Sequence, residues 1–143
     1  MKKSIDVVPA EQGVYAVLYT KGTEPLFVTR GTGGFFKDED PNVPISELKA
    51  NWVKGADIVY IGKAGGEGSN ATLRKRLSQY MKFGSGKKVG HRGGRYIWQL
   101  ADADNLVVCW KVLSTEPREY EHQMISDFKA THAGNRPFAN LVD

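Results

Sequence analysis

The stretch DIVYIGKAGG, residues 57–66, runs from an apolar strand pattern directly into glycines, with a lysine at the join. Residues 57–62 are rich in β-branched and aromatic side chains, which is typical of a strand. The glycines that follow predict a turn. Tyr60 and Lys63 therefore stand at the end of a strand, at the mouth of a glycine-rich turn, which suggests a phosphate-binding site.

A nucleotide-binding P-loop does not explain this turn. That motif needs a glycine five residues before its Gly-Lys pair and a serine or threonine after it. Here Asp57 stands at the first position and Ala64 follows the lysine. No G-x-G-x-x-G follows a strand, and three histidines without H-E-x-x-H plus one cysteine offer no zinc set. The phosphate must belong to another kind of ligand.

The strand at 57–62 has neighbours along the chain that the same patterns predict. Residues 13–20 (GVYAVLYT) are apolar and bounded by turn residues, and residues 25–30 follow as an expected hairpin partner. Residues 105–113 predict a further strand, in which Cys109 is expected to be a buried apolar thiol. Residues 31–44 carry glycines, prolines and acids and predict a long loop.

Helical spacing predicts four helices between and after these strands. A short one covers 45–53 with Ser46 as its cap, and another covers 71–83, capped by Asn70 or Ser69 and stopped by Gly84. Its apolar stripe is Leu73, Leu77 and Tyr80. Residues 95–102 are expected to form a third short helix. The last begins near Pro117 and ends before Gly134, with Tyr120, Met124 and Phe128 as its buried stripe. This order predicts an α+β domain.

Bulk composition limits the class of protein. A chain of 143 residues with 41% hydrophobic and 25% charged residues predicts one globular domain, 1–143. No apolar run approaches the roughly 18 residues that span a membrane, and the N-terminus lacks the apolar core of a signal peptide. We therefore expect no membrane association and a cytoplasmic location.

Positive charge is concentrated in one block. The formal net charge is +4, yet residues 68–101 contain no acid, so the other 109 residues sum to −4. Such a block suits a polyanion, and nucleic acid is the commonest one, although a solvated basic face without a partner is the alternative. Within it lies a basic, glycine-rich loop at 84–94. The block's cations are Arg74, Lys75, Arg76, Lys82, Lys87, Lys88, Arg92 and Arg95.

Five short segments then occur in a meaningful order. They are GVY at 13–15, VYIGK at 59–63, LRKRLSQY at 73–80, EHQMI at 121–125 and RPFAN at 136–140. Together they resemble the GIY-YIG nuclease family over most of the chain. The resemblance implies a small three-stranded antiparallel sheet flanked by helices.

Two departures from the family pattern are visible. Val14 stands where the family name has isoleucine, which is a mild change. The spacing between the first two segments is long, so residues 21–56 are interpreted as an insertion. Since no separate recognition domain is expected, substrate specificity would depend on residues 31–56 of this insertion, on the 84–94 loop or on self-association as a homodimer.

The resemblance also implies a site. Tyr60 would have a base-like role with Tyr15 supporting it, and Arg76 would stabilise phosphate charge. Glu121 would be the metal ligand, for one Mg²⁺ or Mn²⁺ ion, because a single clear carboxylate argues against a two-metal site. The catalytic residues carried over are Tyr15, Tyr60, Lys63, Arg76, Tyr80, Glu121 and Asn140.

The basic block supplies the expected nucleic-acid contacts. These are Arg74, Lys75, Lys82, Lys87, Lys88, His91, Arg92 and Arg95. The sequence thus predicts a metal-dependent DNA endonuclease acting on duplex or branched DNA, with RNA not excluded, as a monomer or homodimer. The alternative is a nucleic-acid-binding module that keeps the scaffold but does not cut. Core packing of the tyrosines and a solvated position for Glu121 remain the structural alternatives.

Overall fold

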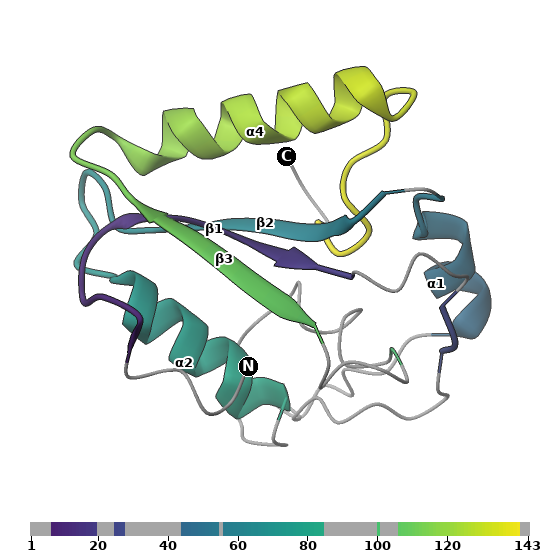
Figure 1. The fold of residues 1–143 in the computed structure, drawn as a ribbon, viewed down its shortest axis with the longest axis horizontal. Helices are drawn as coiled ribbons and strands as arrows, with labels where there is room; N and C mark the ends of the chain where they lie inside the picture. Colours follow the sequence, from purple (N-terminus) through teal and green to yellow (C-terminus); the bar gives the residue numbers. More distant parts are fainter. Residues whose placement is uncertain are drawn as a thin grey trace.

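Three strands and three helices follow one another in the described part of the chain. The computed structural model describes residues 7–19, 25–27, 44–54, 56–84, 100 and 106–140, without the side chains of 80–84. The elements are β1 (Gly13–Leu18), α1 (Ile45–Asn51), β2 (Ile58–Ala64), α2 (Leu73–Gly84), β3 (Val107–Val112) and α4 (Pro117–Thr131). Figure 1 shows their arrangement.

The strands form one antiparallel sheet in the order β2-β1-β3. The predicted α+β class and three-stranded antiparallel sheet are therefore confirmed. The predicted hairpin between 13–20 and 25–30 is wrong, because β2 and β3 occupy both sides of β1. Phe27 instead forms a β-bridge with Leu100, which also contradicts a helix at Leu100.

Helices cover both faces of this sheet, with α4 along one face and α2 along the other (Figure 1). Helix α4 begins with Pro117 at its first turn, as predicted, since proline lacks the N–H that this position leaves unbonded. Its buried residues are Pro117, Ile125 and Phe128. The predicted stripe is wrong at Tyr120, which is exposed, and Met124 is only half-buried.

The cap of helix α2 lies two or three residues after its predicted caps, Asn70 or Ser69. Thr72 is the residue that caps it, because its Oγ1 accepts the N–H of Lys75 at 3.1 Å. Ser69 instead accepts the N–H of Ala71 before the helix begins. Leu73 and Leu77 are buried as predicted, and they pack in one cluster with residues of β1 and β2 and with the N-terminal segment, namely Tyr15, Ala64 and Val8.

Helix α1 is short and starts after Pro44, with no side-chain hydrogen bond at its cap. The predicted cap, Ser46, lies inside the helix. Leu48 is its one buried residue and joins the larger core cluster. The ring of Trp52 contacts those of Tyr19 and Phe138, with centroids 5.3 Å and 5.1 Å apart, so Trp52 packs against this core cluster. This cluster fixes one end of the sheet.

Strand β3 is an edge strand, and most of its side chains are exposed. The prediction that Cys109 is buried is therefore wrong, since Cys109 is exposed, and its neighbour Trp110 is 37% exposed. A continuous apolar run suggests burial on both faces, but α2 and α4 pack mainly against β1 and β2, which leaves most side chains of β3 exposed.

The remaining predictions concern residues that the structure does not describe. They include most of the loops at 31–44 and 84–94 and Trp98 in the predicted helix 95–102. Within the described ranges, no helix is long and apolar enough to cross a membrane.

Candidate active site

The end of β2 opens into a pocket of ≈ 310 Å³ that gathers four predicted site residues. Tyr60 and Lys63 reach it from β2, Arg76 from α2 and Glu121 from α4. Since α2 and α4 lie on opposite faces and β2 is an edge strand, these groups meet around the edge of the sheet (Figure 1). The other lining residues are Ala64, Gly65, Ser69 and Ala71.

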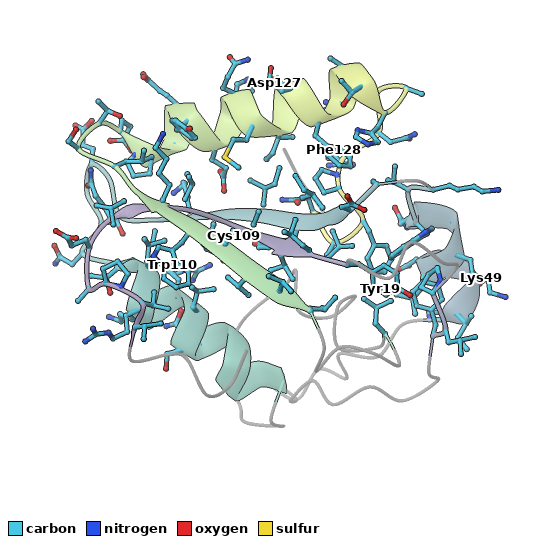
Figure 2. The ribbon with its side chains drawn as sticks, viewed as in Figure 1. Tyr19, Lys49, Cys109, Trp110, Asp127 and Phe128 are labelled. Carbon is cyan, nitrogen blue, oxygen red and sulfur yellow. The ribbon has the colours of Figure 1, made fainter. Side chains whose placement is uncertain are left out.

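The rotation of α4 is what brings Glu121 to this pocket. Residues four and three positions apart share one face of a helix, so Glu121 lies in line with Ile125 and Phe128. Those two are buried against the sheet, and Glu121 is half-buried. Figure 2 shows Phe128 on the sheet side of α4 and Asp127 on the side facing away. The rotation of α4 that buries Ile125 in place of Tyr120 therefore also directs the Glu121 carboxylate toward the pocket.

Tyr15 lies behind Tyr60 and does not line the pocket. It is 1% exposed, and its ring centroid is 6.0 Å from that of Tyr60 with the planes tilted by 42°. It faces Gly62 across the β1–β2 ladder. A Cβ at Gly62 would overlap the Tyr15 ring, 2.5 Å from its hydroxyl oxygen. The tyrosine of the first segment thus packs on the glycine of the second.

Asn140 lies on the outer edge of β2, where its amide acts like a neighbouring strand. Its Oδ1 accepts the N–H of Ile61 at 2.9 Å, and its Nδ2 donates to the carbonyl of Ile61, also at 2.9 Å. Beside it, the N–H of Ala139 donates to the carbonyl of Val59 at 2.8 Å. Asn140 therefore supports the strand between Tyr60 and Gly62 without lining the pocket.

The phenol of Tyr60 is held in its protonated form. Burial raises the pKa of Tyr60 above its ordinary value. The charge of Arg76 opposes this rise, the carboxylate of Glu121 adds to it, and the nearby Tyr15 hydroxyl opposes it. At neutral pH the Tyr60 hydroxyl is therefore neutral and able to orient a polar ligand.

Burial also raises the pKa of Glu121. The cations Lys63 and Arg76 oppose that rise, followed by Arg118 and His122 on its own helix. The carboxylate is thus surrounded by positive charge and remains costly to ionise, because water cannot solvate it fully. A bound divalent cation would favour its charged form.

Glu121 is the group that could bind a metal ion here. In the described part of the chain, no cluster of three or more His, Cys, Asp or Glu side chains could hold an ion. Mg²⁺ needs no such cluster, since it keeps several waters and uses one or two carboxylates. A half-buried carboxylate on a pocket of ≈ 310 Å³ fits that requirement.

Arg76 is braced within its helix. Its Nη1 donates to Oε1 of Gln79, one turn along, at 3.2 Å. Planar guanidinium groups recognise phosphate oxygens in pairs, and a fixed orientation lowers the entropy lost in binding. Arg76 is thus suited to bind an anion in the pocket.

A second, outer pocket of ≈ 770 Å³ continues from the first and shares Lys63, Gly65, Ser69 and Glu121 with it. Sequence reasoning did not find the remaining residues of this wall. Arg118 and His122 lie three residues before and one after Glu121, so helical spacing offered a signal for Arg118. The other lining residues are Glu67, Glu116 and Glu119.

The structure describes only two of the predicted nucleic-acid contacts. Arg74 donates from Nε to the carbonyl of Val8 at 2.7 Å, so it ties the N-terminal segment to α2. Lys75 is exposed. The others lie outside the described side chains, together with that of Tyr80; they are Lys82, Lys87, Lys88, His91, Arg92 and Arg95.

The assembled groups are a neutral phenol, two cations and one carboxylate on a single pocket. Such a set can bind an anion and a divalent cation side by side. Comparisons with protein-family models, curated proteins and solved structures gave no match to this chain.

Proposed function

We propose that this protein is a metal-dependent endonuclease of the GIY-YIG type, hydrolysing phosphodiester bonds of DNA. The observation that carries the proposal is the meeting of Tyr60, Lys63, Arg76 and Glu121 on one pocket, from three different elements. These are residues that the motif order selected before any contact between them was known. Duplex or branched DNA is the proposed substrate, and the cytoplasm the proposed compartment.

Arg76 and Lys63 would bind the scissile phosphate. Hydrolysis adds negative charge to the phosphate oxygens in the transition state, and fixed cations in a partly dry pocket stabilise that charge strongly. Arg76 presents a planar fork and Lys63 a point charge, so the first sets orientation and the second adds attraction. Removing Arg76 should cost on the order of 10²–10³ in rate, by analogy with the loss of one oxyanion donor.

Tyr60 would position the attacking water. A neutral phenol can accept a hydrogen bond from water and donate one to a phosphate oxygen. The water adds to phosphorus and gives up a proton to solvent, the bond from phosphorus to the leaving oxygen breaks, and the leaving oxygen takes a proton from solvent. When Tyr60 is ionised it can also take the proton of the water as a general base.

Glu121 would hold the metal ion, Mg²⁺ or Mn²⁺. When bound, that ion supplies positive charge to the phosphate and to the leaving oxygen. Glu121 lies on the same pocket as both cations, so the ion and the phosphate can be bound together. One carboxylate suits a single ion.

Nicking of supercoiled plasmid tests this proposal. Wild-type protein should convert it to open circles with Mg²⁺ and stop in EDTA. Glu121→Gln should abolish nicking while binding persists, because a charge facing the phosphate has gone. The matched control is Asp127→Asn on the outer side of α4, where Asp127 accepts a hydrogen bond from Gln123 at 2.8 Å (Figure 2).

The outcomes separate the two functions. Asp127→Asn should nick at the wild-type rate. Wild-type protein that binds DNA but nicks with neither Mg²⁺ nor Mn²⁺ would be a binding module rather than a nuclease. Folded Glu121→Gln that cuts normally would place the metal elsewhere.

A further inference from the structure

Side chains from distant parts of the chain pack against the glycine-rich turn that follows β2. Gly65 has φ +86° and lies against Gln12, so a Cβ there would come within 2.5 Å of the Gln12 Cβ. Gly66 has φ +108°, and a Cβ there would overlap the carboxylate of Glu116. Glycine is needed at both places, for backbone conformation and for space.

Glu116 also bonds to this turn. Its Oε2 accepts the N–H of Glu67 at 3.0 Å. Glu116 is the N-cap residue of α4, yet its side chain makes no capping hydrogen bond to that helix. N-cap side chains usually bond to the helix they precede. The Glu116 carboxylate instead accepts a hydrogen bond from the turn that follows β2.

This contact joins the two halves of the proposed site. On one side, the turn begins after Ala64, the residue that follows Lys63, and supplies Gly65 and Ser69 to both pockets. On the other side, α4 begins immediately after Glu116 and carries Glu121. A single carboxylate therefore links the segment that holds the lysine to the helix that holds the expected metal ligand.

Glu116 is itself held from a braced connection. Gln12 Nε2 donates to the carbonyls of Leu113 at 2.9 Å and Thr115 at 3.0 Å. The N–H of Leu113 donates back to the carbonyl of Gln12 at 3.1 Å. These bonds fix the segment between β3 and α4 against the residue before β1. The backbone next to Glu116 is therefore held in a defined position. The hydrogen bond from the Glu67 N–H to the Glu116 carboxylate then positions the turn relative to it.

From these contacts we propose that Glu116 is a positioning residue that sets the separation of Lys63 and Glu121 across the pocket. The inference rests on the proposed endonuclease function for its chemistry. It assigns Glu116 no contact with substrate. Its role is to hold two charged groups at the spacing that an ion and a phosphate require together, since small misplacements of reacting groups are costly in rate.

Two substitutions isolate the bond. Glu116→Ala removes the acceptor, whereas Glu116→Gln keeps an acceptor oxygen and removes the charge. In Glu116→Ala, amide exchange at Glu67 should accelerate and kcat for nicking should fall, each by roughly tenfold, which corresponds to one net hydrogen bond. KM for DNA should change less than about twofold, because uniform binding is untouched. Glu116→Gln should restore both amide protection and kcat. The control is Asp127→Ala, which removes another carboxylate that accepts a hydrogen bond, on the outer side of α4.

The outcomes distinguish failure of this inference from failure of the function. Faster exchange at Glu67 with unchanged kcat would overturn the positioning role. Failure of Glu116→Gln to rescue would also overturn it, because charge rather than the hydrogen bond would then matter. If wild-type protein does not nick, the endonuclease proposal fails. Mn²⁺ affinity measured by calorimetry then decides the inference: it must fall in Glu116→Ala and recover in Glu116→Gln, and an unchanged or undetectable affinity overturns it.

Discussion

The phenol ring of Tyr15 lies over Gly62, its partner across the β1–β2 ladder, so closely that position 62 has no room for a side chain. Tyr60 packs against the same ring, with centroids 6.0 Å apart. Because Gly62 has no side chain, the Tyr15 ring can lie over it and pack against Tyr60 of the neighbouring strand. This relationship explains why the two segments occur together, without any appeal to catalysis by Tyr15.

Gly62→Ala should destabilise the fold by roughly 1–3 kcal/mol, the usual cost of overpacking a filled core. The loss should be smaller in a Tyr15→Leu background, because contacting residues are not additive. Denaturant unfolding measures both. The control is Gly68→Ala: Gly68 has φ +76° and nothing within 4 Å of an added Cβ, so its backbone cost should be the same in both backgrounds. Equal losses for Gly62→Ala in the two backgrounds would contradict the contact.

Asn140→Ala should cost roughly 1–3 kcal/mol, because both polar groups of Ile61 lose their partner at once. Asn140→Asp keeps the acceptor for the Ile61 N–H but sets an oxygen against the Ile61 carbonyl, so it should be no better. Asn135→Ala is the control, since the Asn135 side chain donates an exposed hydrogen bond to the His132 carbonyl at 3.0 Å. Similar chemical denaturation midpoints for the Asn140 and Asn135 variants would refute the strand-like role.

Glu121→Gln should be more stable than wild type at neutral pH without metal. Burial raises the pKa of Glu121 in the folded state, so the folded protein binds the proton more tightly than the unfolded chain. Stability therefore falls as pH rises from the unfolded pKa through the folded one, and it stays lower above it. The glutamine variant lacks this decrease. Thermal melts across acid to neutral pH check it, and parallel curves for both proteins would contradict it.

The nicking rate should rise with pH if ionised Tyr60 acts as the base. The pKa of Tyr60 is raised, so its reactive form is scarce at neutral pH and increases toward alkaline pH. Tyr60→Phe should lower the rate by roughly 10²–10⁴ and flatten the profile. A flat wild-type profile would indicate that Tyr60 only orients water. A slope that survives in Tyr60→Phe would assign the ionisation to another group, such as metal-bound water.

Sequence patterns predicted the elements well and their exposure less well. The three strands and the helices at 73–84 and 117–131 followed from β-branched runs and helical spacing, whereas the three-stranded antiparallel sheet was implied by the family resemblance. The inward face of α4 did not, because Phe128 belongs to two overlapping stripes, one through Tyr120 and one through Glu121. Carboxylates rarely lie on a buried line, which favoured the wrong stripe. The exposure of Cys109 depends on which strands the helices cover, and no local pattern contains that information.

Sequence patterns selected part of the pocket lining and none of its contacts. Motif order selected Tyr60, Lys63, Arg76 and Glu121, which share a pocket, but also Tyr15 and Asn140, which do not line it. Glu116 escaped notice because its partners are the turn residues Gly66 and Glu67, far away in the chain. A contact of that kind becomes visible only when the strands are paired.

The amide of Asn140 completes the ladder of a strand that lies 79 positions earlier in the chain. Contacts so distant in sequence form late, because the intervening chain must first be brought together. During synthesis, the first three segments of the proposed site leave the ribosome well before residue 140 does. The support that Asn140 gives to β2 beside Tyr60 should then form only after residue 140 has been synthesised and has reached Ile61.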